Sequence, residues 1–317
     1  MSPDPTGGPS SGNRSSARSS TGNRSSARSS TGDRPAAGSS PGTRPSGEAP
    51  PLLGNWLSRL EDHLSRCEHL TLCLDFDGTL APIAEDPDAA AMPADVERAL
   101  AALADRPGVE PAVVSGRALS DLRERVDPDV TLAGNHGLEM DRGEREWVHP
   151  AAAERRGALE RAIGDVAERL AAYPDCRIED KGVTATVHHR GADADHATVQ
   201  AAVRTALSDE SALVATEGRK IVEVRPDVEW HKGKAVRELV DDGERASAVY
   251  VGDDVTDEDA FEALEDLSCR SVGVLVGDRP SAADYRVHDV DCVRAFLAWL
   301  ADEVHPAGGP PDGDAGP

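Results

Sequence analysis

Short apolar runs alternate with stretches of helical periodicity along the middle of the chain, and this alternation limits the possible folds more than any other feature. Such alternation is typical of an α/β fold built on a largely parallel sheet. We expect strands at Leu70–Asp75, Val109–Val114, Val130–Ala133, Ala246–Val251 and Ser271–Val276. The helical patterns between and around them span Asn55–Glu68, Ala94–Ala104, Leu119–Val126, Gly233–Val240, Thr256–Leu264 and Val293–Val304.

Residues 143–225 have a different pattern. Two long helical patterns, at about 151–173 and 193–208, are interspersed with strands whose residues alternate between apolar and polar. Those strands are expected at Cys176–Asp180, Val183–His189, Leu213–Thr216 and Lys220–Arg225. The simplest interpretation is an α+β cap at 143–225, inserted into a parallel core made of residues 51–142 and 226–304.

Both ends of the chain differ in composition from this middle part. Residues 1–50 are rich in Ser, Gly, Pro and Arg and contain a ten-residue near-repeat, SGNRSSARSS, TGNRSSARSS and TGDRPAAGSS. Such a segment buries too little apolar surface to offset the entropy lost on ordering, so we expect a disordered tail. An organelle transit peptide is the less favoured alternative, because the segment lacks an apolar helical face. Residues 305–317 are rich in Pro, Gly and Asp, and we expect them to be disordered too.

The net charge excludes some classes of partner. The chain has 34 Lys and Arg against 58 Asp and Glu, a formal charge of −24, so it should repel nucleic acid and anionic membrane surfaces. It contains no run of 18 apolar residues and no apolar signal segment, which predicts a soluble, cytoplasmic protein without a membrane span. Its five scattered cysteines favour reduced thiols over disulfides or zinc ligands.

Lysine is scarce in this acidic chain. Its lysines are Lys181, Lys220, Lys232 and Lys234. An acid-rich, lysine-poor surface suggests a protein that stays soluble in concentrated salt, where screening weakens the repulsion between its own charges. We therefore expect a salt-adapted protein whose melting temperature rises in molar KCl.

The segment LCLDFDGTL, residues 72–80, carries the strongest chemical signal. Its apolar strand delivers Asp75 and Asp77 to the carboxyl end, where ligands bind in open α/β sheets, and Gly78 allows a sharp turn. Two carboxylates at this spacing can divide the work, with one attacking as a nucleophile and the other exchanging protons. The backbone carbonyl of Asp77 could also help to hold a cation.

A second apolar strand ends in an acidic cluster, within YVGDDVTDEDAF at residues 250–261. Asp253 and Asp254 follow the strand directly, and Asp257 lies in the first turn of the predicted helix. Carboxylates gathered without His or Cys favour Mg²⁺ over zinc. A capped helix would explain Asp257, but it would leave the Gly-Asp-Asp at the strand end without a role.

Two shorter segments suit phosphate binding. VVSGR, residues 113–117, ends a strand with the hydroxyl of Ser115 and a glycine that frees backbone N–H groups for phosphate oxygens. Lys232, at a predicted helix start, could neutralise charge on the phosphate and on an attacking carboxylate. Each of these signals is weak by itself.

Taken in order, these four segments resemble the haloacid dehalogenase superfamily of phosphotransferases. DFDGTLAPIAEDPD, AGNHGLEM, the stretch from KGV to HHR, EGRKIVEVRP and GDDVTDEDAF resemble the trehalose-6-phosphate phosphatase family more specifically. The resemblance implies a Rossmann-like core with an inserted α/β cap, dependence on Mg²⁺, and hydrolysis of the small molecule trehalose 6-phosphate. It also implies a possible functional link to a trehalose-6-phosphate synthase.

The resemblance assigns roles residue by residue. Asp75 matches the nucleophile and Asp77 the acid/base. Matches to the magnesium ligands are Asp75, the Asp77 carbonyl and Asp253, with Asp254 and Asp257 in support. Ser115 and Lys232 match the phosphate-binding pair. The residues expected to contact the substrate are Arg117, Asn135 and His136 in the core, and Glu179, Lys181, Arg190, Arg219, Lys220 and Glu223 in the cap.

The match has departures, and other functions stay open. Arg219 lies where similar proteins often place Lys, and the alternation of a strand cannot put both Arg219 and Lys220 on the substrate face. Val255 lies where relatives often have Arg.

Alternative functions are a phosphatase for sucrose 6-phosphate or mannosyl-3-phosphoglycerate, a non-catalytic partner domain of a trehalose-6-phosphate synthase, and a phosphomutase. A non-catalytic domain would be expected to lack the nucleophile or a metal ligand. This chain keeps all four expected groups, which are Asp75, Asp77, Lys232 and Asp253.

Overall fold

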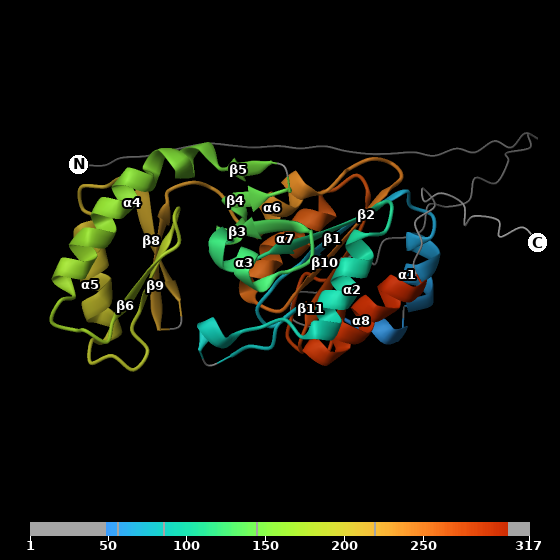
Figure 1. Cartoon of the computed structure of the whole chain (residues 1–317), viewed down its shortest axis with the longest axis horizontal. Helices are drawn as coiled ribbons and strands as arrows, with labels where there is room; N and C mark the ends of the chain where they lie inside the picture. The colour runs from blue at the N-terminus through green and yellow to red at the C-terminus, as the bar shows by residue number, and fades with distance from the viewer. Residues whose placement is uncertain (1–48, 56, 85, 144, 219, 304–317) are drawn as a thin grey trace, which may run out of the picture. The chain divides into compact units, whose positions relative to one another are not determined.

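An eight-stranded sheet forms the core of the protein (Figure 1). The structure is a computed structural model and describes residues 49–303 except 56, 85, 144 and 219. The strand order is β12-β11-β10-β1-β2-β3-β4-β5. The five expected core strands are present and pair in parallel: β1 (His69–Leu74), β2 (Val109–Val114), β3 (Thr131–Gly134), β10 (Ala246–Gly252) and β11 (Arg270–Val276).

The pairing of the central strands brings the predicted motifs to one edge of the sheet. Leu74 at the end of β1 pairs with Val251 of β10 on one side and with Val113 of β2 on the other. Because parallel strands end at the same edge, the residues that follow these three strands meet there. The segments DFDG, SGR and GDD are the ones that follow them.

Helices cover both faces of this sheet. The apolar side chains on one face pack with α1 (Leu57–Leu64), α2 (Ala94–Ala104), α3 (Leu119–Arg125) and α8 (Val290–Glu303). Those on the other face pack with α6 (Lys232–Leu239) and α7 (Glu258–Glu265). Short 3₁₀ turns complete the core at η1 (Leu53–Asn55), η2 (Pro87–Ala89), η3 (Asn135–Gly137) and η4 (Val255–Asp257). The layers α/β/α agree with the predicted α/β class.

Three short strands were not expected from the sequence. β4 (Glu139–Asp141) and β5 (Glu146–Val148) extend the sheet in antiparallel fashion beyond β3, and β12 (Tyr285–Val287) pairs in parallel with β11. The expected start of the cap at residue 143 lies before β5, which belongs to the core sheet. We therefore place the start of the insertion at Pro150, where α4 begins.

The inserted cap has its own sheet and its own apolar core. Its four strands run in the order β6-β7-β9-β8, with bounds Arg177–Asp180, Ala185–His188, Ile221–Pro226 and Leu213–Gly218. α4 (Pro150–Arg169) and α5 (His196–Ala206) pack on one face through Leu159, Val166, Val199 and Val203, which meet Val222 and Val224 of β9. The cap is therefore an α+β unit, as the sequence predicts.

The two linkers between core and cap contact each other through aromatic rings. Trp147 and His149 lie where the chain leaves the core, and Trp230 lies where it returns, just before α6. The ring centroid of Trp230 is 5.4 Å from that of Trp147 and 4.8 Å from that of His149. The chain therefore enters and leaves the cap at one place.

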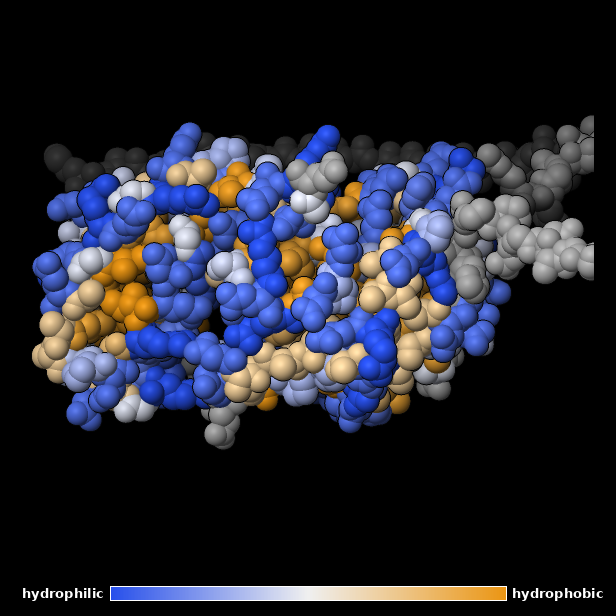
Figure 2. Space-filling model, in the orientation of Figure 1, coloured by the Kyte–Doolittle hydropathy of each residue, from blue (hydrophilic) through white to orange (hydrophobic). Residues whose placement is uncertain are grey.

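The surface seen in Figure 2 is mostly hydrophilic, with apolar side chains gathered in separate areas. Among the described residues, the large apolar side chains that are strongly exposed are Ile83 and Val255. The described helices include none with the length and apolar character that a bilayer span requires.

The two predicted disordered tails lie outside the described residues, except for Ala49 and Pro50. Pro50 is buried, and its carbonyl accepts a hydrogen bond from Arg286.

Candidate active site

A buried lysine between two aspartates lies at the carboxyl edge of the core sheet. Asp75 follows β1, Lys232 begins α6, and Asp257 ends η4. The Nζ atom of Lys232 is 2.7 Å from Oδ1 of Asp75 and 2.7 Å from Oδ1 of Asp257. The side chains of Lys232, Asp75 and Asp257 are 3%, 7% and 0% exposed, respectively. One ammonium thus holds two carboxylates that are almost shielded from water.

Burial and mutual attraction shift the pKa values in this cluster. Burial lowers the pKa of Lys232, but the charges of Asp75 and Asp257 outweigh it and raise that pKa above its ordinary value. Burial raises the pKa of Asp75, and Lys232 opposes that rise. Two carboxylates share one ammonium here, so the cluster carries an excess of negative charge that a further cation would relieve.

Asp257 is the most connected member of the cluster. Its Oδ1 also accepts a hydrogen bond from the hydroxyl of Tyr250 at 2.6 Å, and its Oδ2 accepts one from the backbone N–H of Asp254 at 2.9 Å. The carboxylate of Asp254 accepts in return from the backbone of Asp257, which closes a capping box. Tyr250 was not predicted as a site residue, although its hydroxyl in an otherwise apolar strand was a signal for one.

The donor set fits a hard divalent cation such as Mg²⁺. Asp75, Asp253 and Asp257 each offer a carboxylate oxygen, and these oxygens lie within 4.8 Å of one another. Oδ1 of Asp253 is buried and has no hydrogen-bond partner among the described residues. Burial, then the charges of Asp257 and Asp254, raise the pKa of Asp253 to about 6. A cation would satisfy this orphaned oxygen, whereas both oxygens of Asp257 already have partners.

The turn after β1 lies directly against this acidic site. Gly78 has φ of +79°, and a Cβ atom added there would lie 2.3 Å from Oδ2 of Asp253. Only glycine avoids that clash while adopting the left-handed conformation. The close approach places Asp77, the residue before Gly78, next to the carboxylate cluster.

Asp77 forms an ion pair with Arg117. Nε and Nη2 of Arg117 are each 2.7 Å from one carboxylate oxygen of Asp77. Nη1 of Arg117 also donates to Oδ2 of Asp121 at 2.7 Å, and Nη2 donates to the carbonyl of Pro87 at 2.9 Å. Arg117 was expected to contact substrate, but in this structure its guanidinium is occupied by protein oxygens.

The loop that follows β2 brings Ser115 beside the turn of η3. Ser115 is 2% exposed, and its carbonyl accepts a hydrogen bond from the N–H of His136 at 2.8 Å. A Cβ atom added at Gly116 would lie 2.8 Å from the His136 ring, so the ring lies flush against this loop. Burial, then the charges of Lys232, Lys181 and Arg225, lower the pKa of His136 to about 3. The imidazole is therefore neutral at physiological pH.

One lysine of the cap reaches the same loop. Nζ of Lys181, in the turn between β6 and β7, donates to the carbonyl of Gly116 at 3.1 Å. The backbone carbonyl of Lys181 accepts from the side-chain amide of Asn135 at 3.0 Å. The structure thus brings Lys181, Asn135, His136 and Ser115 together at the junction of cap and core.

The other predicted cap residues lie on the cap sheet and its ends. Glu179 and Glu223 both pair with Thr186 of β7, so their side chains share one face of the sheet. Glu179 accepts a hydrogen bond from His188 at 2.7 Å, which lowers its pKa. Arg190 and Lys220 are exposed, and Lys220 has φ of +66° in the hairpin between β8 and β9. Arg219 lies outside the described residues.

This arrangement combines the parts needed for transfer of a phosphoryl group. The buried carboxylate of Asp75 lies beside the ammonium of Lys232, and Asp75 and Asp253 can together hold a metal ion. Asp77, a second acid, follows Asp75 by two residues. A strand-end loop with a hydroxyl and a glycine lies at the same edge. The motifs predicted from the sequence are therefore neighbours in space.

Comparison with known proteins agrees with this geometry. The family model described as trehalose-phosphatase matches residues 73–291. The trehalose-phosphate phosphatase of Mycobacterium avium (strain 104) is 36% identical over 248 residues, which cover 74% of this chain and 63% of that protein. The chain thus matches somewhat less than two thirds of the length of that relative.

Solved structures give the same result for the fold. The C-terminal domain of the C. albicans trehalose-6-phosphate phosphatase superposes with a TM-score of 0.65 at 26% identity, covering 80% of this chain and 98% of that one. A haloacid dehalogenase-like hydrolase from Bacteroides thetaiotaomicron, 13% identical, superposes with a TM-score of 0.50 over 73% of this chain and 99% of that one. The expected fold of haloacid dehalogenase type with an inserted cap is confirmed, and the chain belongs to the trehalose-phosphatase family.

Proposed function

We propose that this protein hydrolyses trehalose 6-phosphate to trehalose and phosphate, with Asp75 as the nucleophile. The observation that carries the proposal is the pairing of Asp75 with Lys232 at 2.7 Å, at a strand end shared with the acidic site around Asp253. Membership of the trehalose-phosphatase family supports the choice of substrate.

The reaction needs extensive stabilisation of charge. Phosphate monoesters are among the slowest compounds to hydrolyse without a catalyst, so the site has to remove on the order of 20 kcal/mol of barrier. An anionic carboxylate has to approach an anionic phosphoryl group. The ammonium of Lys232 reduces the repulsion between them, because it lies against the attacking carboxylate.

Mg²⁺ would be held by Asp75, Asp253 and the backbone carbonyl of Asp77. Asp254 and Asp257 would support this set from behind, through the capping box and the contact with Lys232. When bound, the ion would supply positive charge that orients the phosphoryl group and stabilises its transition state.

In the first step, a carboxylate oxygen of Asp75 forms a bond to phosphorus while the bond from phosphorus to the sugar oxygen breaks. Asp77, protonated at this stage and therefore not in its ion pair with Arg117, gives its proton to the departing sugar oxygen, which releases trehalose and leaves an aspartyl-phosphate. We expect the hydroxyl of Ser115, which accepts from the N–H of Arg117 at 3.2 Å, to bind a phosphoryl oxygen.

In the second step, Asp77 takes a proton from a water molecule whose oxygen attacks phosphorus. The bond between phosphorus and Asp75 breaks, and phosphate leaves. One residue can act as acid and then as base because the two steps need opposite proton transfers. The cap residues Glu179, Lys181, Arg190, Arg219, Lys220 and Glu223, with His136 of the core, would bind the disaccharide.

The proposal extends to the setting of the enzyme. A trehalose-6-phosphate synthase is the enzyme expected to supply the substrate, and we infer a cytoplasmic location for both. The acidic composition supports a protein that works without nucleic-acid partners.

Phosphate release from a panel of sugar phosphates tests the proposal. The full chain is assayed with trehalose 6-phosphate, sucrose 6-phosphate and mannosyl-3-phosphoglycerate, with Mg²⁺ or with EDTA. We expect the highest kcat/KM for trehalose 6-phosphate and no turnover in EDTA. A higher kcat/KM for either of the other two substrates would replace the proposed one.

Two variants test the assignment of roles. Asp75→Asn should abolish turnover while the protein stays folded, and retained hydrolysis would reject Asp75 as the nucleophile. Asp77→Asn should slow the first-turnover release of trehalose far more than that of p-nitrophenol from p-nitrophenyl phosphate, whose leaving group needs no proton. Equal losses in first-turnover release from both substrates would reject the role of Asp77 as general acid.

A further inference from the structure

We propose that Asn135 is a positioning residue that fixes Lys181 over the Ser115–Arg117 loop, instead of a residue that touches the sugar phosphate. The inference rests on the proposed function, because it concerns how the cap of that phosphatase is held. We call the set of Asn135, Glu139, Thr184 and the backbone of Lys181 the core–cap latch.

The side-chain amide of Asn135 uses its hydrogens and its oxygen within the latch. Nδ2 donates to Oε2 of Glu139 at 2.8 Å and to the carbonyl of Lys181 at 3.0 Å. Oδ1 accepts from the hydroxyl of Thr184 at 2.7 Å. The opposite orientation of the amide would set its oxygen against two other oxygens, so the partners determine which end is nitrogen.

The latch is shielded from water. Asn135 is 0% exposed, Thr184 is 1% exposed and Glu139 is 8% exposed. An amide with all its hydrogens bonded and no exposed surface has nothing to offer a substrate. Because buried hydrogen bonds are costly to leave unmade, these contacts should hold the cap and core together firmly at this point.

The latch is hydrogen-bonded to both ends of one tight turn of the cap, at Lys181 and at Thr184. The N–H of Lys181 donates to the carbonyl of Thr184 at 2.9 Å, and the N–H of Gly182 donates to Asp180 at 2.9 Å. Gly182 has φ of +82°, which suits a sharp turn. With the turn closed in this way, bonds to the Lys181 carbonyl and the Thr184 hydroxyl fix the base of the Lys181 side chain.

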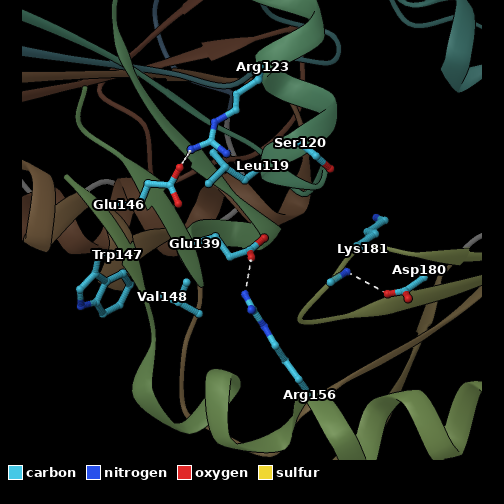
Figure 3. Close-up of a pocket in the computed structure, with 11 residues that line it drawn as sticks. Leu119, Ser120, Arg123, Glu139, Glu146, Trp147, Val148, Arg156, Asp180 and Lys181 are labelled. Atoms are coloured by element: carbon cyan, nitrogen blue, oxygen red, sulfur yellow. Dashed lines mark hydrogen bonds and ion pairs between the residues drawn. The ribbon is translucent and has the colours of Figure 1, made fainter. Parts of the chain in front are cut away.

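Glu139 ties the latch to the first cap helix as well. Its Oε1 accepts from Nη2 of Arg156 in α4 at 3.2 Å. Figure 3 shows these two side chains pointing toward each other in the lining of a cavity of about 270 Å³, which Asp180 and Lys181 also line. One core carboxylate is thus bonded to Asn135 and to the cap.

The backbone at Asn135 adopts a costly conformation to make these contacts. Its φ is +52° and that of His136 is +58°, both in the left-handed region that few residues other than glycine adopt. Asn tolerates this region better than most residues, and the latch hydrogen bonds offset the remaining cost. The same turn sets the His136 ring against Gly116.

The core–cap latch fixes the position of the Lys181 ammonium. The Lys181 ammonium donates to the carbonyl of Gly116 at 3.1 Å, within the loop that carries Ser115. A flexible lysine side chain is held this closely only if its backbone is held too. Breaking the latch should therefore weaken the reaction through Lys181, although neither Asn135 nor Thr184 touches substrate.

Variants at Thr184 test the latch from the cap side. Thr184→Val removes the hydroxyl with little change of shape, whereas Thr184→Ser keeps it. We expect Thr184→Val to lower kcat/KM for trehalose 6-phosphate about tenfold, because the loss of one buried hydrogen bond corresponds to about that ratio. Thr184→Ser should stay within about twofold of wild type. Thr205→Val, an exposed threonine in cap helix α5, is the matched control and should leave kcat/KM unchanged.

A second variant tests the pairing of the two residues. Asn135→Gly removes the amide but keeps the left-handed backbone. We expect it to lower kcat/KM at least as much as Thr184→Val does, and the double variant to be no worse than Asn135→Gly alone. Multiplicative losses in the double variant, or equal losses for Thr184→Ser and Thr184→Val, would overturn the latch.

Urea unfolding of wild type, the two single variants and the double variant separates this inference from the proposed function. The latch predicts that the two substitutions also lower the free energy of unfolding non-additively. If wild type releases no phosphate from trehalose 6-phosphate and the unfolding data are non-additive, the proposed function fails and the latch stands. Additive unfolding data in an active enzyme would reject the latch alone.

Discussion

Arg117 binds both carboxylate oxygens of Asp77 through two parallel hydrogen bonds of 2.7 Å. Asp121, held in turn by Arg125, fixes the other side of the guanidinium. The expected acid/base is therefore aimed by a side chain that is anchored in α3. Arg117 comes from the loop that carries Ser115, so one loop orients both the acid/base and the proposed phosphate site.

This geometry predicts the effect of Arg117→Lys. A lysine keeps the charge but cannot donate two parallel hydrogen bonds to one carboxylate, so Asp77 should lose its fixed position. We expect kcat for trehalose 6-phosphate to fall about tenfold or more while KM changes little. Steady-state kinetics check this, and a rise in KM at constant kcat would instead support direct binding of substrate by Arg117.

Removal of the buried lysine should destabilise the fold. Lys232→Met leaves Asp75 and Asp257 buried without their shared ammonium, and breaking such a pair costs about 3–5 kcal/mol. Lys234→Met is the matched control, because Lys234 is 40% exposed and its partner Glu229 is 3.7 Å away. Urea unfolding should show a large loss for the first variant and almost none for the second. Similar losses for both would contradict the buried pairing.

The acidic site predicts a pH dependence of stability in metal-free protein. Burial raises the pKa of Asp253 from its ordinary 3.8 to about 6. Between these pH values the folded state holds a proton that the unfolded state releases, so this group's contribution to stability falls as the pH rises. Asp253→Asn should lack this loss, and the melting-temperature advantage of the variant in EDTA should grow from pH 4 to pH 6. A constant difference between the two proteins would contradict the raised pKa.

The formal charge of −24 predicts a response to salt. Repulsion among surface carboxylates is screened within about 3 Å at 1 M ionic strength, so the melting temperature should rise from low salt to molar KCl. Choline chloride at equal ionic strength serves as a control for the identity of the cation. A melting temperature that does not rise in either salt would remove the basis for expecting salt adaptation.

The parts of the fold that the sequence predicts are those with long apolar runs. Apart from exposed His69, β1 and β10 are buried on both faces, so each is a largely apolar run, with Thr71 and Ser247 as polar exceptions, that ends in a motif. β4 and β5 have three residues each and carry acidic residues, so no apolar run marks them; β5 is the edge strand of the sheet. Their pairing depends on the hairpin that joins them to β3 and not on a local pattern.

The candidate site was predictable where contact follows from sequence order. Asp75, Asp77 and Asp253 follow central strands, so the parallel sheet brings them together whatever the details of packing. The hydrogen bond between Thr184 and Asn135 joins residues 49 positions apart, one before a cap strand and one after a core strand, and no periodicity encodes it. The hydroxyl of Tyr250 in an apolar strand is a signal for a site residue, but the pattern does not reveal which side of the strand meets Asp257.

The contact between Trp147 and Trp230 bears on how the core tolerates its insertion. The chain leaves the core and returns to it at one aromatic junction. With respect to the core, the cap is therefore a long surface insertion whose two ends lie in contact. The entropy of closing a loop rises only slowly with its length, so the size of what is inserted there has little influence on the catalytic strands. A different cap could be grafted at this junction if it kept the contacts that Lys181 and Arg156 make with the core.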